Sequence, residues 1–126
     1  MDRQFIFTNT QHNSLDTSKR LVENLKGEGG KKIQELVEFV NDDALGDVAK
    51  EQIKSADVVW ANDFSWGTES QEKLERVAFD SMTEGSCLVL YRPPLLMQEL
   101  DWSSGAKIND LPTSWNPRLS FYLLVR

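Results

Sequence analysis

The sequence predicts an α/β protein with a mostly parallel sheet, helices on both faces and an antiparallel C-terminal strand. Two continuous apolar runs, Asp57–Ala61 and Ser86–Tyr91, flank an amphipathic helical stretch, Thr68–Met82. A strand–helix–strand unit of this kind joins parallel strands, and strands that are apolar on both sides are covered on both faces. A chain of 126 residues, 40% of them hydrophobic, is long enough for one core. We therefore expect a single domain over residues 1–126.

The N-terminal quarter is expected to begin with a strand and a helix. Gln4–Thr8 (QFIFT) is short, apolar and rich in residues that favour strands. A helix with one apolar face should follow, begun by Ser14 or Asp16 and ended by Gly27.

The next stretch, Lys31–Val40, fits two interpretations. Its apolar residues have helical spacing, but its second half also fits a strand. We favour a strand centred on Leu36–Val40, because the polar run Asn41–Asp43 would end it. A short helix over Ala44–Ser55 is expected before the first buried strand.

Thr68–Met82 gives the strongest helix signal in the chain. Thr68 is expected to cap it, with Gln71 three residues later in a capping-box arrangement, and Gly85 should stop it. The charges of Glu69–Arg76 are interpreted as a solvated face.

The C-terminal third is expected to be mostly irregular. Leu95–Trp115 is punctuated by glycine and proline, and Leu119–Val125 (LSFYLLV) predicts a closing strand. Trp102 and Trp115 are interpreted as lids on the core, with an exposed interface as the alternative.

Composition excludes several function classes. The chain has 14 basic and 20 acidic residues and a net charge of −6, which disfavours binding to nucleic acid or to an anionic membrane. Cys87 and His12 are the only residues of their kinds, so no intrachain disulfide, thiolate zinc site or multi-histidine site is expected. No apolar run approaches the roughly 18 residues of a membrane span. With no signal-peptide layout, we expect an intracellular, cytoplasmic protein.

Ligands of parallel α/β sheets bind beyond the carboxyl ends of the strands, which directs attention to Asn41–Gly46 and Asn62–Gly67. In the second segment, Asn62 could accept a hydrogen bond from an amine, and Phe64 and Trp66 could wall an apolar or cationic site. The alternative is a structural turn whose aromatic residues cover the rim of the core.

Residues 57–93 resemble part of a class I S-adenosylmethionine methyltransferase, from its fourth strand to its fifth. They look most like the non-SET histone-lysine methyltransferases of the disruptor-of-telomeric-silencing family. The resemblance is carried by the loop Asn62–Gly67 (NDFSWG), by Met82–Ser86 (MTEGS) and, at the C-terminus, by Ser120–Leu123 (SFYL). It implies an incomplete Rossmann-like fold.

The resemblance also implies roles for individual residues. Asn62 would lie between the methyl donor and the target amine, as a catalytic and cofactor-contacting residue. Phe64 and Trp66 would line the channel for a lysine substrate, and Asp43 would meet the adenine amine of S-adenosylmethionine. No metal is implied.

The sequence also departs from this family. Ala44 stands where the family has an aromatic residue that stacks on adenine, and Asn9 follows the first strand where an acid should meet the ribose. We expect no acidic-Gly-x-Gly turn before Phe5. Gly27–Gly30 follows a helix, not a strand, and is interpreted as a helix stop and a flexible turn.

Two functions remain open. The departures favour a non-enzymatic or degenerate methyltransferase-like module with a protein partner and no cofactor. The alternative is an S-adenosylmethionine-dependent lysine methyltransferase or a fragment of one, which would be nuclear if it acted on histones. Since a sheet without its central strand has a bare edge, we also expect a homodimer, formed by strand pairing or across Trp102 or Trp115.

Overall fold

The computed structural model describes residues 5–8, 20–21, 23–40, 45–63, 66–114 and 116–126. The chain divides into two compact units, Met1–Ala49 and Lys50–Arg126. Each unit is described by itself below.

The first unit contains a pair of parallel strands. Strand β1 (Phe5–Thr8) pairs with β2 (Val37–Val40), with Phe5 opposite Val37 and Thr8 opposite Val40. Helix α2 (Gly27–Leu36) runs directly into β2. Both interpretations of Lys31–Val40 are therefore partly right, because its first half is helical and the favoured strand follows.

The glycine-rich stretch Gly27–Gly30 forms the first turn of α2, so its interpretation as a helix stop and flexible turn is wrong. Gly27 has a positive φ of 80°. A Cβ atom at Gly30 would lie 2.7 Å from the carbonyl carbon of Leu25, which leaves no room for a side chain. The glycines thus allow a tight entry into α2. Most of the helix predicted before Gly27, with its caps Ser14 and Asp16, lies outside the described residues.

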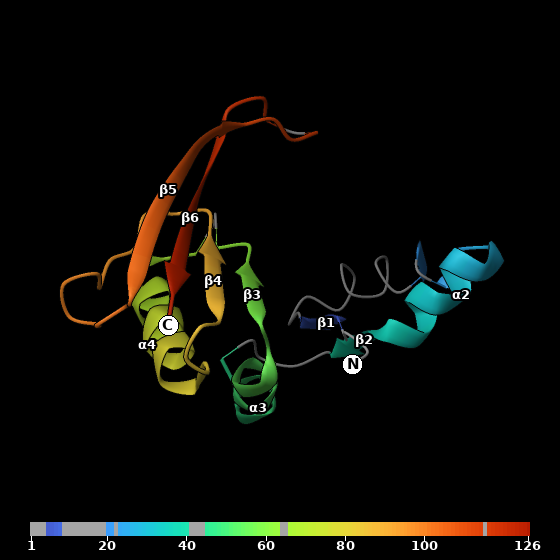
Figure 1. The fold of residues 1–126 in the computed structure, drawn as a ribbon, viewed down its shortest axis with the longest axis horizontal. Helices are drawn as coiled ribbons and strands as arrows, with labels where there is room; N and C mark the ends of the chain where they lie inside the picture. The colour runs from blue at the N-terminus through green and yellow to red at the C-terminus, as the bar shows by residue number, and fades with distance from the viewer. Residues whose placement is uncertain (1–4, 9–19, 22, 41–44, 64–65, 115) are drawn as a thin grey trace. The chain divides into compact units, whose positions relative to one another are not determined.

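Helix α3 (Asp47–Ser55) leads into the second unit, whose sheet has four strands. These are β3 (Val58–Ala61), β4 (Cys87–Leu90), β5 (Ser104–Leu111) and β6 (Leu119–Val125). Their order is β3-β4-β6-β5 (Figure 1). The β3–β4 pair is parallel and the other two pairs are antiparallel, which confirms the predicted α/β class and its antiparallel closing strand.

Strand β5 occupies part of the stretch that was predicted to be irregular. All eight of its residues are exposed, and among the described strands it pairs with β6 alone. The pairing is irregular between Ile108 and Leu111, where Asp110 has a φ of 56°. A polar, exposed edge strand gives little periodic signal, and this explains why the sequence pattern did not reveal it.

Helix α4 (Thr68–Ser81) connects β3 to β4 as predicted. Its N-cap is Gly67, and no side chain makes a capping hydrogen bond, so the predicted capping box is wrong. Gln71 points its side chain into the interior instead, where its Nε2 lies 3.2 Å from Oε2 of Glu75. Glu75 is fully buried, which corrects the prediction that the charges of Glu69–Arg76 all lie on a solvated face.

The core of the second unit lies around the two inner strands. Leu88 and Leu90 of β4 are fully buried, as is Ala78 of α4. Trp102 is 8% exposed and packs edge-on against Phe79, with ring centroids 5.1 Å apart. It is therefore a lid on the core, and its alternative interpretation as an exposed interface residue is wrong.

Trp115 lies outside the described residues. Among the residues that are described, no helix is long and apolar enough to cross a membrane.

Candidate functional site at the carboxyl edge of strands β3 and β4

The loop after β3 and the end of β4 lie at the same edge of the sheet, because the two strands are parallel and in register, with Ala61 opposite Leu90. Asn62 and Asp63 continue from β3, while Tyr91 and Arg92 continue from β4. Asn62 is exposed, but Asp63, its direct neighbour, is fully buried. At this edge the side-chain amide of Asn62 is therefore accessible, whereas the carboxylate of Asp63 is not.

The buried carboxylate joins the two strand ends. Oδ1 of Asp63 accepts hydrogen bonds from the backbone N–H of Tyr91 at 2.8 Å and of Arg92 at 3.3 Å. Its backbone carbonyl accepts from the N–H of Trp66 at 3.1 Å. The Arg92 guanidinium donates to the carbonyl oxygen of Trp66. These bonds fix the loop to the end of β4, so Asp63 acts here as a structural acceptor.

Three aromatic side chains contact one another at this edge: Trp60 of β3, Tyr91 directly after β4 and Phe121 of β6. Trp60 Nε1 donates a hydrogen bond to the Tyr91 hydroxyl at 2.9 Å. The Trp60 ring meets those of Tyr91 and Phe121 edge-on, at centroid distances of 6.0 and 5.3 Å. Edge-on aromatic contacts of this kind stabilise a fixed arrangement beyond the area that they bury. The tryptophan nevertheless remains 58% exposed.

The structure describes two of the four site residues that the sequence predicts. Asn62 is exposed at the end of β3, and Trp66 is half-buried in the loop that Asp63 holds. Phe64 and Asp43 lie outside the described residues. The assignments of these four residues to catalysis, substrate and cofactor stay predictions.

Sequence reasoning missed Trp60, Tyr91 and Arg92. The available signal was the parallel register of β3 and β4, since both strand ends must meet at one edge. Only the segments that follow β2 and β3 were considered, and the segment that follows β4 completes the site.

The chemistry offered by the described side chains is binding and positioning. Asn62 offers an amide that both donates and accepts, Trp60 offers an exposed ring, and Arg92 offers a positive charge. The carboxylate of Asp63 is enclosed and bonded to backbone N–H groups. Among the described residues, none forms a cluster of three or more histidine, cysteine or acidic side chains that could hold a metal ion.

The acidic-Gly-x-Gly turn that the sequence resemblance calls for follows none of the strands in the described residues. Gly27–Gly30 instead forms the first turn of α2. A Cβ atom at Gly27, Gly29 or Gly67 would meet open space, and at Gly30 it would meet Leu25. We derive no chemical step through the cofactor.

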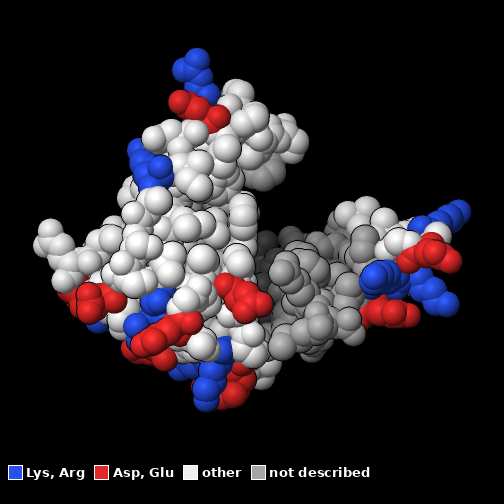
Figure 2. Space-filling model, in the orientation of Figure 1, with Lys and Arg blue, Asp and Glu red and all other residues white. Residues whose placement is uncertain are grey.

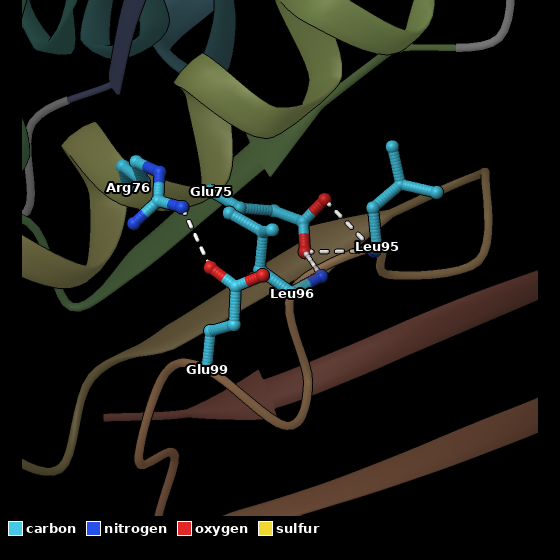
Figure 3. Close-up of polar contacts among 5 residues, drawn as sticks. All are labelled: Glu75, Arg76, Leu95, Leu96 and Glu99. Atoms are coloured by element: carbon cyan, nitrogen blue, oxygen red, sulfur yellow. Dashed lines mark hydrogen bonds and ion pairs between the residues drawn. The ribbon is translucent and has the colours of Figure 1, made fainter.

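The carboxylate of Glu75 holds the irregular segment that follows β4 in place, as Figure 3 shows. Glu75 of α4 accepts hydrogen bonds from the backbone N–H groups of Leu95 (2.9 Å) and Leu96 (3.0 Å). The neighbouring Arg76 forms an exposed ion pair with Glu99 at 2.7 Å. Because charged acceptors bind N–H groups strongly, Glu75 fastens the irregular segment to α4.

A cavity of about 360 Å³ lies at the opposite end of the sheet, where β3 and β4 begin. It is lined by Lys54–Asp57 and Thr83–Ser86. The Thr83 hydroxyl donates to the Lys54 carbonyl oxygen at 2.7 Å, which joins its two walls. This hollow is at the amino ends of the strands, so it is separate from the predicted site.

Comparison with known proteins identifies the fold. No protein-family model matches the chain, and a search of curated proteins finds no match. Among solved structures, the chain is similar to a precorrin 8w decarboxylase from Methanobacterium thermoautotrophicum, with a TM-score of 0.61 and 12% identity over 98% of this chain and 70% of that one. It is also similar to an rRNA methylase from Streptococcus thermophilus, with a TM-score of 0.50 and 12% identity over 99% of this chain and 87% of that one. The fold is therefore methyltransferase-like.

Proposed function

We propose that this chain is a methyltransferase-like module that acts through contacts with protein rather than by transferring a methyl group. The observation that carries this proposal is the exposure of two apolar side chains of β3. Val58 and Trp60 are 57% and 58% exposed, although they belong to an apolar strand. Large apolar side chains that remain accessible at a sheet edge are typical of association surfaces.

The candidate site supports the same conclusion. The described residues supply Asn62 and Trp66 but no acidic-Gly-x-Gly turn after a strand, and Oδ1 of Asp63 is bonded to the backbone of β4's end. In the view of Figure 2, acidic and basic side chains lie next to one another where charges gather at the margins, and the middle of the face is uncharged. With a net charge of −6, this mixture favours a protein partner over a polyanion.

We expect the protein to bind neither S-adenosylmethionine nor its demethylated product. Isothermal titration calorimetry with each compound measures this directly. A dissociation constant tighter than about 100 μM, equivalent to about −5.5 kcal/mol, would overturn the proposal. A matched titration of the Asn62→Ala variant then identifies the place of binding, because this exposed side chain can be removed without opening the core.

One observation favours an alternative, a lysine methyltransferase of the disruptor-of-telomeric-silencing type. Asn62 directly follows a parallel strand and is exposed, and Trp66, four residues later in the same loop, is half-buried. The accessible amide of Asn62 is what supports this alternative. An enzyme would need binding of the methyl donor in the titration above. Loss of methyl transfer in the Asn62→Ala variant, with an unchanged unfolding transition, would then support this alternative.

A further inference from the structure

We draw no further inference here: the strongest candidate, the cavity of about 360 Å³ at the amino ends of β3 and β4, indicates no ligand, because the hydroxyl groups of Ser55, Thr83 and Ser86 in its walls donate to nearby carbonyl oxygens and nothing in the described part of the structure shows what would bind beside its exposed charges.

Discussion

Replacing Glu75 by alanine should lower the free energy of unfolding by about 3 kcal/mol, because it removes the acceptor of several interior hydrogen bonds. The carboxylate is fully buried and accepts from the backbone N–H groups of Leu95 and Leu96 and from the Gln71 amide. Alanine would leave these donors without partners and open a cavity beside α4. Urea denaturation followed by circular dichroism measures the loss.

Glu99→Ala is the matched control for this prediction. The side chain of Glu99 is 59% exposed and forms a surface ion pair with Arg76, as Figure 3 shows. Its removal should cost less than about 1 kcal/mol. Glu75→Gln should have an intermediate effect, since the remaining carbonyl oxygen can still accept from Leu95 and Leu96. Equal losses for Glu75→Ala and Glu99→Ala would contradict the structural role of Glu75.

Asp63→Ala should lower the free energy of unfolding by about 2 kcal/mol and release the loop from the end of β4. The carboxylate is fully buried and accepts from the N–H groups of Tyr91 and Arg92. Without it, two backbone donors at the strand end lose their partner. Asp63→Asn keeps one acceptor oxygen at this position and should recover part of the stability. Thermal and urea denaturation provide the measurement.

The neighbouring residue gives a sharp comparison for Asp63. Asn62→Ala changes an exposed side chain in the same loop, so its effect on stability should stay within about 0.5 kcal/mol. Equal destabilisation by Asn62→Ala and Asp63→Ala would contradict this assignment. It would mean that the buried Asp63 carboxylate is no more important for stability than the exposed Asn62 side chain.

The elements with strong apolar patterns could be predicted from the sequence. Strand β6 was predicted with the bounds that the structure gives, and α4 with an error of one residue at its end. Both bury a row of side chains, so tertiary packing and the local pattern agree. Strand β5 could not be predicted, because its exposed residues are held by the backbone pairing with β6 rather than by burial.

The polar interior of α4 shows a second limit of the sequence pattern. Gln71 was predicted to take part in a capping box and Glu75 to lie on a solvated face, but both are fully buried. Their burial depends on the N–H groups of Leu95 and Leu96, which lie some 20 residues further along the chain. A local pattern contains no information about such distant donors. For the same reason the sequence directed attention to Asn62, which follows β3, but not to Tyr91, which follows β4 and lies at the same edge.

The fastening of Leu95 and Leu96 to α4 also affects the local dynamics of the chain. Surface segments without regular secondary structure usually open easily and exchange their amide protons quickly with solvent. Here the two amides are bound to an enclosed carboxylate, and Leu96 itself is only 3% exposed. Their release requires the interior beside α4 to open, so their deuterium uptake should be as slow as that of the central strands.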